Sequence, residues 1–272
     1  MGKLIYATGK TGTIGKYLPE YVIPIRTDLK SKLNVFQSIP LSFEDVVVHL
    51  GAVVGIEKVQ EISAESYLVN VVGTKNLGII SKQKNVKKFI YVSTAHVYKP
   101  GPEFLAENDK LEPLNEYAYQ KYLGELELLS VFTDSPEKLC IVRLFSILDW
   151  GMPDFSLGGA VKKIQSSSSK FNLANGDDVR DFLTPKQVAD ILIKIAANES
   201  AHGIINVCTG IPNKIIDAVP LMFDQESRAE IRSRISFGNS KISRIVGDSS
   251  SIRKLLPNFD FKWNPQVQRT TH

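Results

Sequence analysis

Residues 115–122, with the sequence NEYAYQKY, bring tyrosine hydroxyls and a lysine ammonium close together. Tyr117 and Lys121 are four residues apart, so on a helix their side chains lie on the same face. Tyr119 is two residues from Lys121 and points in another direction, so we assign Tyr119 and Tyr122 to packing. The spacing predicts that, if any pair acts together as a proton donor, it is Tyr117 with Lys121.

A glycine-rich segment, ATGKTGTIG, follows the first apolar run of the chain directly. Glycine lets the backbone turn sharply and approach a pyrophosphate, while the start of the next helix supplies N–H groups and a dipole. The glycines could also form a plain tight turn. A P-loop is excluded, because its first glycine would have to stand at Leu4. The position between a strand and a helix favours a dinucleotide-binding turn, made of Gly9, Lys10, Thr11, Gly12, Thr13, Ile14 and Gly15.

The end of the second apolar run, VIPIRTD, predicts which cofactor is bound. In such folds an acid at this place accepts a hydrogen bond from a ribose 2′-hydroxyl, whereas an arginine suits a 2′-phosphate. Arg26 stands at the strand end and Asp28 lies just beyond it. We therefore favour NADP(H). The alternative is that Arg26 is a solvated surface residue and Asp28 holds the ribose of NAD.

Short apolar runs alternate with helical patterns through the first half of the chain. The runs are rich in valine and isoleucine, as central strands of a parallel sheet are when helices cover both faces. Helices are expected at about 64–83 and 116–132, and a first helix of about two turns should contain Pro19. This alternation predicts an α/β fold, with a Rossmann-type doubly wound parallel sheet and a small C-terminal substrate-binding domain.

The second half combines further sheet elements with less regular segments. In LTPKQVADILIKIAA, Thr184 can cap a helix and Pro185 suits its first position. INVCTG reads as a strand and DSSSIRKLL as a short helix. We assign residues 1–148, with about 183–209, to the cofactor-binding domain. Residues of about 149–182 and 210–272 form the small substrate-binding domain.

Composition narrows the class of protein. The chain has 272 residues and a net charge of +4, with scattered Lys and Arg, so nucleic-acid binding has little support. No apolar run reaches the ~18 residues of a membrane span, and no signal-peptide layout is present, so we expect a cytoplasmic protein without membrane contact. Cys140 and Cys208 lie in strand-like runs and are expected to be buried thiols. No metal site is expected.

The motifs occur in a characteristic order: TGKTGTIG, VVHLGA, VNVVGTKNL, FIYVSTAHVY, YAYQK, VRLFSI and GDDVRDFLTPKQVAD. This set resembles the extended short-chain dehydrogenases, the NAD-dependent epimerase/dehydratase family that acts on nucleotide sugars. The resemblance runs from Lys3 to about Gly210 and is faint beyond it. It implies a nucleotide-sugar substrate and, because the helices at 64–83 and 116–132 pair in many relatives, a homodimer.

The resemblance assigns roles by position. Tyr117 matches the catalytic tyrosine, Lys121 its lysine, and Thr94 the Ser/Thr that hydrogen-bonds the substrate oxygen. Asn70 matches a structural asparagine near the cofactor, and the segment Leu50, Gly51 and Ala52 lies under its adenosine side. On the substrate side, Arg180 matches an arginine that commonly binds the diphosphate, and Ser146 stands where many relatives have an asparagine.

The physics of these groups agrees with the roles. A tyrosine has a reference pKa near ~10, and a lysine ammonium and an oxidised nicotinamide both lower that value. Tyr117 can then act as general acid or base on a sugar hydroxyl or ketone, while the nicotinamide carries the hydride. His96, two residues after Thr94, matches the position of an acid/base cysteine in GDP-fucose synthase. The plainer interpretation, which we favour, is a polar residue facing the substrate.

Three functions remain open on these residues. We expect an NADPH-dependent reductase of a 4-keto(-6-deoxy) nucleotide-diphosphate sugar, because Arg26 favours NADPH. Dehydratases of the family usually carry an acid after the Ser/Thr, but Ala95 follows Thr94 here. The first alternative is a nucleotide-sugar 4-epimerase with bound NAD. The second is a cofactor-sensing regulator without catalysis, against which the set Thr94, Tyr117 and Lys121 argues.

Overall fold

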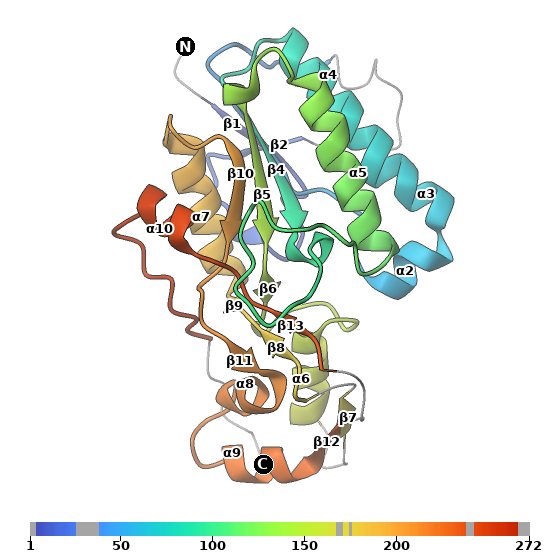
Figure 1. The fold of residues 1–272 in the computed structure, drawn as a ribbon, viewed down its shortest axis with the longest axis vertical. Helices are drawn as coiled ribbons and strands as arrows, with labels where there is room; N and C mark the ends of the chain where they lie inside the picture. The colour runs from blue at the N-terminus through green and yellow to red at the C-terminus, as the bar shows by residue number, and fades with distance from the viewer. Residues whose placement is uncertain (1–3, 26–37, 167–170, 174–175, 238–241, 266–272) are drawn as a thin grey trace.

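The computed structural model describes residues 4–25, 38–166, 171–173, 176–237 and 242–265. A six-stranded sheet lies at its centre, in the order β10-β5-β4-β3-β1-β2, and every neighbouring pair is parallel (Figure 1). The predicted Rossmann-type doubly wound sheet is therefore confirmed. Its strands are β1 (Ile5–Thr8), β2 (Ile23–Pro24), β3 (Val46–His49), β4 (Lys88–Thr94), β5 (Leu139–Leu144) and β10 (Gly203–Val207).

Helices cover both faces of this sheet (Figure 1). One face carries α7 (Pro185–Ala197) and α10 (Ser250–Leu255). The other face carries α4 and α5, with α2 and α3 beyond them. The helices on this second side are α2 (Ile56–Glu61), α3 (Ser63–Tyr67), the π-helical η2 (Leu68–Gly73), α4 (Thr74–Gln83) and α5 (Glu116–Val131).

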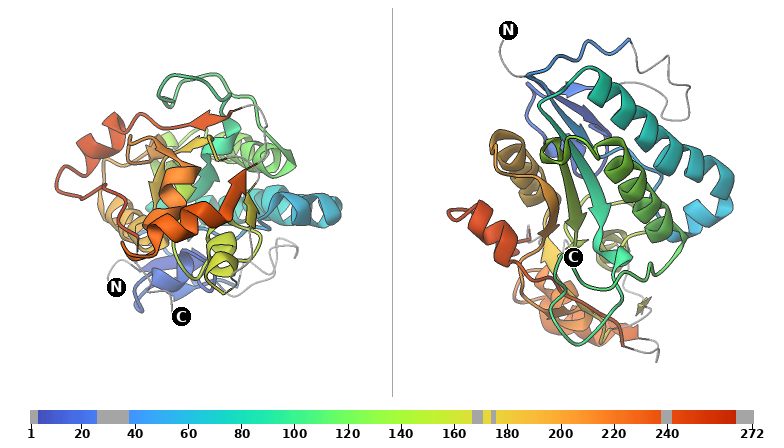
Figure 2. Two further views of the ribbon diagram at one scale, coloured as in Figure 1. Left: turned by 90° about the horizontal axis from the view of Figure 1, so that it is seen from below. Right: turned by 45° about the horizontal axis from the view of Figure 1, so that its top comes forward.

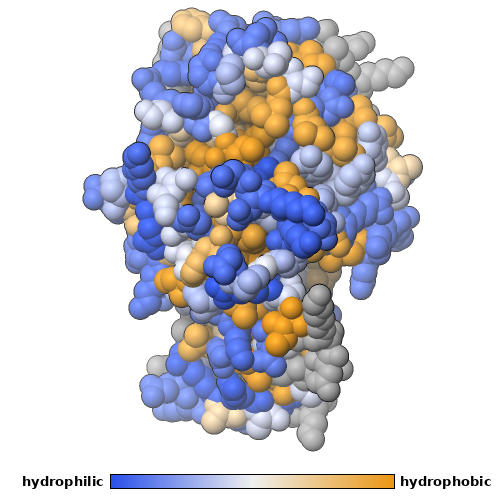
Figure 3. Space-filling model, in the orientation of Figure 1, coloured by the Kyte–Doolittle hydropathy of each residue, from blue (hydrophilic) through white to orange (hydrophobic). Residues whose placement is uncertain are grey.

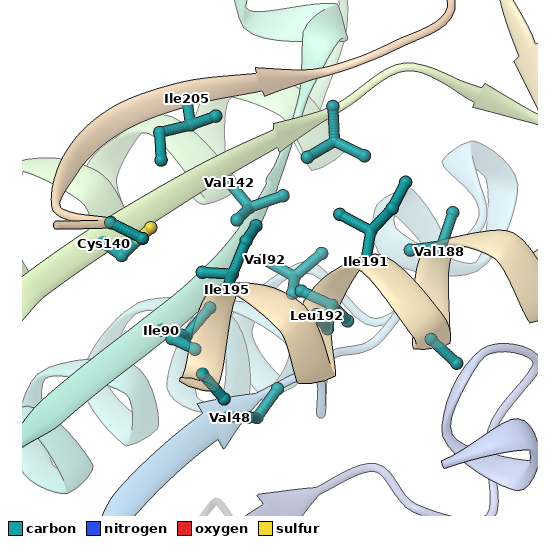
Figure 4. Close-up of a cluster of buried hydrophobic side chains, with 14 of the residues drawn as sticks. Val48, Ile90, Val92, Cys140, Val142, Val188, Ile191, Leu192, Ile195 and Ile205 are labelled. Atoms are coloured by element: carbon teal, nitrogen blue, oxygen red, sulfur yellow. The ribbon is translucent and has the colours of Figure 1, made fainter. Parts of the chain in front are cut away.

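The core between the sheet and α7 explains the near-continuous apolar runs of the sequence. Figure 4 shows side chains of the central strands pointing at one face of α7. Because helices cover the sheet on both sides, these strands bury side chains in both directions and show no polar alternation. The cluster labelled in Figure 4 consists of Val48, Ile90, Val92, Cys140, Val142, Val188, Ile191, Leu192, Ile195 and Ile205.

The ends of three predicted helices agree with the structure. Thr184 caps α7 as expected: its hydroxyl accepts from the Gln187 N–H at 3.1 Å, and the Gln187 side chain accepts from the Thr184 N–H at 2.9 Å. Pro185 takes the first helical position, where its missing N–H costs nothing. Asn115 caps α5 by accepting from the Ala118 N–H at 2.9 Å. The expected short helix near the end is α10.

The first helix is shorter than the sequence predicts. In place of two turns, a single 3₁₀ turn, η1 (Gly15–Tyr17), follows the glycine segment. Pro19 explains the difference, because the residue before a proline is pushed out of the helical region. Leu18 accordingly has an extended backbone, with φ −65° and ψ 139°.

The helix predicted at 64–83 is present but not uniform. It consists of α3, η2 and α4 in direct succession, and its middle is π-helical. A π-helix bonds residue i to i+5 and occurs frequently at functional sites. Here the π-helical stretch carries Asn70.

A lower lobe lies beyond the carboxyl ends of the sheet strands (Figures 1 and 2). Its own apolar cluster includes Leu148, Phe182, Phe223 and Trp263. The elements of the lower lobe are β6 (Ser146–Ile147), α6 (Leu157–Gln165), β7 (Phe171–Leu173), β8 (Val179–Arg180), β9 (Phe182–Leu183), β11 (Asn213–Lys214), α8 (Ile215–Leu221), α9 (Arg228–Arg234), β12 (Ile235–Phe237) and β13 (Arg244–Ile245). Two further 3₁₀ turns are η3 (Ala95–Val97) and η4 (Pro136–Lys138).

The structure also bears on the two cysteines and on membrane-spanning segments. Cys140 and Cys208 are both free and buried, as expected. Within the described ranges no helix combines the length and the apolar character that crossing a bilayer requires.

Candidate active site

The glycine segment lies where the strand order reverses, between β1 and β3. In open α/β sheets ligands bind at this point, beyond the carboxyl ends of the strands. Gly9 has φ +67°, and a Cβ on it would lie 2.8 Å from the Gly51 nitrogen. Only glycine permits this conformation and this close approach. Thr8 fixes the second segment, because its hydroxyl accepts from the Gly51 N–H at 2.9 Å.

The turn presents free donors to a cavity. The Gly12 N–H bonds the Gly9 carbonyl at 2.9 Å, which closes the turn. The N–H groups of Thr13 and Ile14 donate to no acceptor within the described ranges. A cavity of about 470 Å³ is lined by Thr11, Gly12 and Thr13, among others. Free N–H groups at the start of η1 beside a cavity fit a pyrophosphate.

The predicted cofactor residues around this turn divide into three groups. Leu50, Gly51 and Ala52 lie beside the turn, as expected from the contact between Gly9 and Gly51. The Lys10 ammonium turns away to bond the carbonyls of Pro19 at 3.0 Å and of Val22. The Lys10 side chain therefore stabilises the segment that leads into β2 and does not line the cavity. Arg26 and Asp28 lie outside the described residues.

Asn70 joins the cofactor side of the site to the catalytic helix. Its Oδ1 accepts from the Val53 N–H at 2.8 Å, and its Nδ2 donates to the Val53 carbonyl at 3.0 Å and to Gln120 Oε1 at 2.9 Å. Gln120 is part of α5, between Tyr117 and Lys121. The buried Asn70 amide thus fixes the loop after β3 and α5 relative to one another.

Thr94 and Tyr117 lie at the carboxyl ends of the sheet strands. Thr94 is the last residue of β4, and its Oγ1 accepts from the His96 N–H at 3.2 Å. This bond uses one lone pair and leaves the hydroxyl proton for another acceptor. Tyr117 stands in the first turn of α5, half-buried. Burial raises the pKa of Tyr117 to about 12, which is opposite to the direction expected from the sequence.

Lys121 is buried although it is a lysine. It is 2% exposed, and its Nζ lies 4.0 Å from the centre of the Tyr91 ring. Burial lowers the pKa of Lys121 to about 7, while the nearby Glu125 carboxylate acts in the opposite direction. An ammonium held in an apolar setting interacts strongly with any polar group brought near it. The raised pKa of Tyr117 has desolvation by burial as its cause, and Lys121 contributes nothing to that shift.

A buried ion pair that was not predicted from the sequence lies next to this lysine. Arg143 of β5 donates to Glu125 through Nη2 at 2.8 Å and Nε at 3.2 Å, and the two side chains are 3% and 1% exposed. Ser93 of β4 also donates to Glu125. The signal was present in the spacing, since Tyr117, Lys121 and Glu125 repeat every four residues and so share one helix face.

The substrate-side residues come from η3, which holds His96, and from two strands of the lower lobe, which hold Ser146 and Arg180. Ser146 of β6 pairs with Phe182 of β9. His96 is half-buried, and burial lowers its pKa to about 4, helped by the positive charge of Arg180. His96 is therefore neutral near pH 7. The Arg180 guanidinium donates to Asp178 Oδ2 at 2.8 Å and to the Ser243 carbonyl at 2.8 Å, so it is partly engaged already.

The remaining tyrosines of the motif differ from one another. Tyr122 packs against the cluster of Ala95, Val97, Tyr98 and Phe145, as predicted. The sequence also assigns Tyr119 to packing, but this side chain is 52% exposed. Helical spacing correctly places Tyr119 on a different face of α5 from Tyr117 and Lys121. It does not show that this face is exposed.

Comparison with known proteins agrees with this geometry. Residues 19–208 match the model of the NAD dependent epimerase/dehydratase family. The chain is 27% identical to GDP-6-deoxy-D-talose 4-dehydrogenase of Aggregatibacter actinomycetemcomitans, over 93% of this chain and 91% of that protein. It is 25% identical to GDP-6-deoxy-D-mannose reductase of Pseudomonas aeruginosa, over 82% and 80% of the two chains.

Solved structures show the same fold. RMD from Pseudomonas aeruginosa, complexed with NADPH, superposes with a TM-score of 0.80 at 21% identity, over 98% of this chain and 95% of that chain. UDP-N-acetylglucosamine 4-epimerase from Methanobrevibacter ruminantium also gives 0.80, at 22% identity over 96% and 93%. The chain therefore belongs to the NAD dependent epimerase/dehydratase family and is an NAD(P)-dependent enzyme of the extended short-chain dehydrogenase/reductase type.

Proposed function

We propose that the protein is an NADPH-dependent reductase of a 4-keto(-6-deoxy) nucleotide-diphosphate sugar. The observation that supports it best is the Thr94, Tyr117 and Lys121 set at the carboxyl edge of β4, on the same edge of the sheet as the turn of free N–H groups. Both relatives named above act, by their names, on GDP-6-deoxy sugars, one as a reductase and one as a 4-dehydrogenase. These two names describe opposite directions of one type of redox step.

The residues have distinct tasks in this reaction. When bound, the reduced nicotinamide supplies the hydride that reaches C4 of the sugar. Tyr117, with its pKa raised to about 12, is protonated at neutral pH and can donate its proton to the carbonyl oxygen. The free hydroxyl proton of Thr94 holds the same oxygen. Lys121 holds the nicotinamide ribose, and the approach of that polar group offsets its desolvation.

On the substrate side we assign binding to His96, Ser146 and Arg180. Arg180 carries the positive charge that a sugar diphosphate requires, and guanidinium binds phosphate oxygens in a bidentate manner. His96 is neutral near pH 7, since its pKa is lowered to about 4, and can hydrogen-bond a sugar hydroxyl. This supports substrate contact for His96 and disfavours an acid/base role.

The preference for NADP(H) rests on Arg26 as the reader of the 2′-phosphate. A neighbour of the same fold was solved with NADPH, whereas MoeE5, at a TM-score of 0.78 and 20% identity over 96% of this chain and 94% of that chain, was solved with NAD. The alternative reaction is therefore a 4-epimerase that retains NAD. The regulator hypothesis has no observation in its favour.

Titration of the purified protein with NADPH and NADH, followed by nicotinamide fluorescence, separates these proposals. We expect tighter binding of NADPH, and an Arg26→Ala variant that weakens NADPH but not NADH. GDP-linked 4-keto-6-deoxyhexoses then come first in a substrate panel, with UDP- and dTDP-linked analogues as controls. Preference for NADH, or a preparation that retains NAD through purification, would overturn the reductase in favour of the epimerase.

We also propose a homodimer formed through the helices beside the sheet. Five large apolar side chains on α3, η2 and α5 are between 43% and 52% exposed: Tyr67, Leu68, Tyr119, Leu126 and Leu129. Figure 3 shows apolar surface gathered over the upper half of the molecule, where α4 and α5 lie. Exposed apolar side chains grouped in this way are typical of interaction surfaces. A light-scattering mass equal to one chain would refute the dimer.

A further inference from the structure

Two lysines, one from each lobe, border the cavity above the glycine turn. Lys16 belongs to η1, directly after Gly15, and Lys162 belongs to α6 of the lower lobe. The cavity of about 470 Å³ lies between them, and an acidic residue also borders it. The lining residues that matter here are Thr11, Gly12, Thr13, Lys16, Asp154 and Lys162.

Neither ammonium is neutralised by its surroundings. Lys16 Nζ makes only a 3.5 Å contact with the Gly151 carbonyl and lies 5.2 Å from the centre of the Tyr17 ring. Considering only residues that the structure describes, neither Lys16 nor Lys162 forms an ion pair with a carboxylate. Other surface lysines do form ion pairs, for example Lys186 with Asp190 at 2.8 Å.

The chemistry of the cavity is therefore that of a diphosphate site. Among the described residues, the N–H groups of Thr13 and Ile14 have no acceptor and the ammonium groups of Lys16 and Lys162 have no carboxylate partner. These four groups lie at or beside the same cavity. A pyrophosphate carries two negative charges, which two lysines would balance. Asp154 is exposed at the same cavity and opposes the binding of an anion. We propose that Lys16 and Lys162 clasp the pyrophosphate of the nicotinamide cofactor, one from each lobe.

This inference rests on the proposed function, because it assumes that the glycine turn holds a nicotinamide dinucleotide. It adds a contact from the lower lobe, which otherwise holds only the substrate residues. This clasp, the pair Lys16 and Lys162, contacts only the pyrophosphate, which NADPH and NADH share. It therefore does not distinguish the two cofactors.

The test measures binding rather than turnover. The full chain is titrated with NADPH, with NADH and with reduced nicotinamide riboside, which carries neither phosphate. We expect Lys16→Gln and Lys162→Gln each to raise the Kd for both dinucleotides about 3- to 10-fold, and to leave the Kd for the riboside within about 2-fold. Lys163→Gln, on the same helix but outside the cavity, is the matched control and should change nothing. Asp154→Asn should lower the Kd for both dinucleotides, because it removes a negative charge from the cavity.

Two further measurements distinguish a lost charge from a misfolded variant. Lys162→Arg keeps the charge and should restore most of the affinity, which a loss through misfolding would not show. Raising the ionic strength should weaken NADH binding to the wild type more than to the double Lys16→Gln, Lys162→Gln variant, because salt screens the removed charges.

The outcomes separate failure of the clasp from failure of the proposed function. If the wild type binds dinucleotides and the lysine variants bind them equally well, the clasp is wrong and the enzyme assignment stands. If only NADPH is weakened, the lysines read the 2′-phosphate, and the pyrophosphate clasp is overturned. If only nucleotide-sugar binding is weakened, the lysines serve the substrate diphosphate, which also overturns it. If the wild type binds no nicotinamide dinucleotide, the proposed function falls together with the clasp.

Discussion

The two walls of the site are built differently. The sheet wall, formed by the ends of β4, β5 and α5, rests on strands of six or seven residues and a helix of sixteen. Its ion pair, Arg143 with Glu125, is 3% and 1% exposed. The lower wall rests on the two-residue strands β6 and β8, and its ion pair, Arg180 with Asp178, is 16% and 13% exposed. A rigid wall suits the fixed geometry of proton transfer, whereas a lightly supported wall suits the reading of different sugars.

The largest expected effect removes the proton donor from the sheet wall. Tyr117→Phe should lower kcat by roughly 10²- to 10⁴-fold, because the carbonyl oxygen loses its general acid. The Kd for NADPH should change less than about 2-fold, since the ring remains in place. Tyr119→Phe is the matched control, because Tyr119 lies outside the site and the change keeps the ring that the proposed dimer surface uses. Equal activity of Tyr117→Phe and wild type would remove Tyr117 from catalysis.

The second prediction compares the two ion pairs. Glu125→Gln leaves the buried Arg143 charge without its partner and should lower the free energy of unfolding by about 3–5 kcal/mol. Asp178→Asn breaks the corresponding ion pair of the lower wall, but Arg180 keeps its hydrogen bonds to two backbone carbonyls. The free energy of unfolding should therefore fall by only about 1–2 kcal/mol. Urea unfolding of both variants measures the difference. Similar losses would show that the walls are equally rigid.

The third prediction concerns the buried lysine. The folded state lowers the pKa of Lys121 to about 7, so between that value and the unfolded pKa the unfolded chain binds more protons and stability rises with pH. Below pH about 7 Lys121 is charged in the folded state, and burying this charge lowers the free energy of unfolding by its full amount. Lys121→Met should therefore stabilise the protein by about 1–3 kcal/mol at acidic pH, with a smaller gain above neutrality, while activity is lost. A stabilisation that grows as pH rises would contradict the assignment.

The smallest effect is expected at the lower wall. Arg180→Lys keeps the charge but loses the fork of donors that binds a diphosphate. We expect KM for the nucleotide sugar to rise about 10-fold with kcat within about 3-fold. Steady-state kinetics at saturating NADPH gives both numbers. A fall in kcat without a change in KM would place Arg180 in the chemical step instead.

The sheet wall could largely be predicted from the sequence, because its signals are local. The apolar runs, the helix predicted at 116–132 and the glycine turn each depend on neighbouring residues, and each is present in the structure. The lower lobe depends on distant pairing: β12 joins β7, and β9 joins β6. Strands of two or three residues leave no readable period.

Side-chain environments were harder to predict than elements. Spacing brought Tyr117 and Lys121 together but did not show that burial would raise the pKa of Tyr117 to about 12 and lower that of Lys121 to about 7. The glycine motif named Lys10 but did not show that its ammonium bonds the carbonyls of Pro19 and Val22. Desolvation and such contacts depend on the folded surroundings, which a local motif does not contain.

The ratio of NADPH oxidised to nucleotide sugar converted tests the proposed reaction most directly. The wild type is mixed with limiting NADPH and an excess of a GDP-linked 4-keto-6-deoxyhexose, and both products are counted at completion. A reductase in which Tyr117 supplies the proton predicts one NADPH oxidised for each sugar reduced, and no further conversion once NADPH is exhausted. An unreduced 4-keto sugar, together with conversion of a GDP-linked 6-deoxyhexose to its C4 epimer without net change in nicotinamide, would contradict the reductase and identify a 4-epimerase.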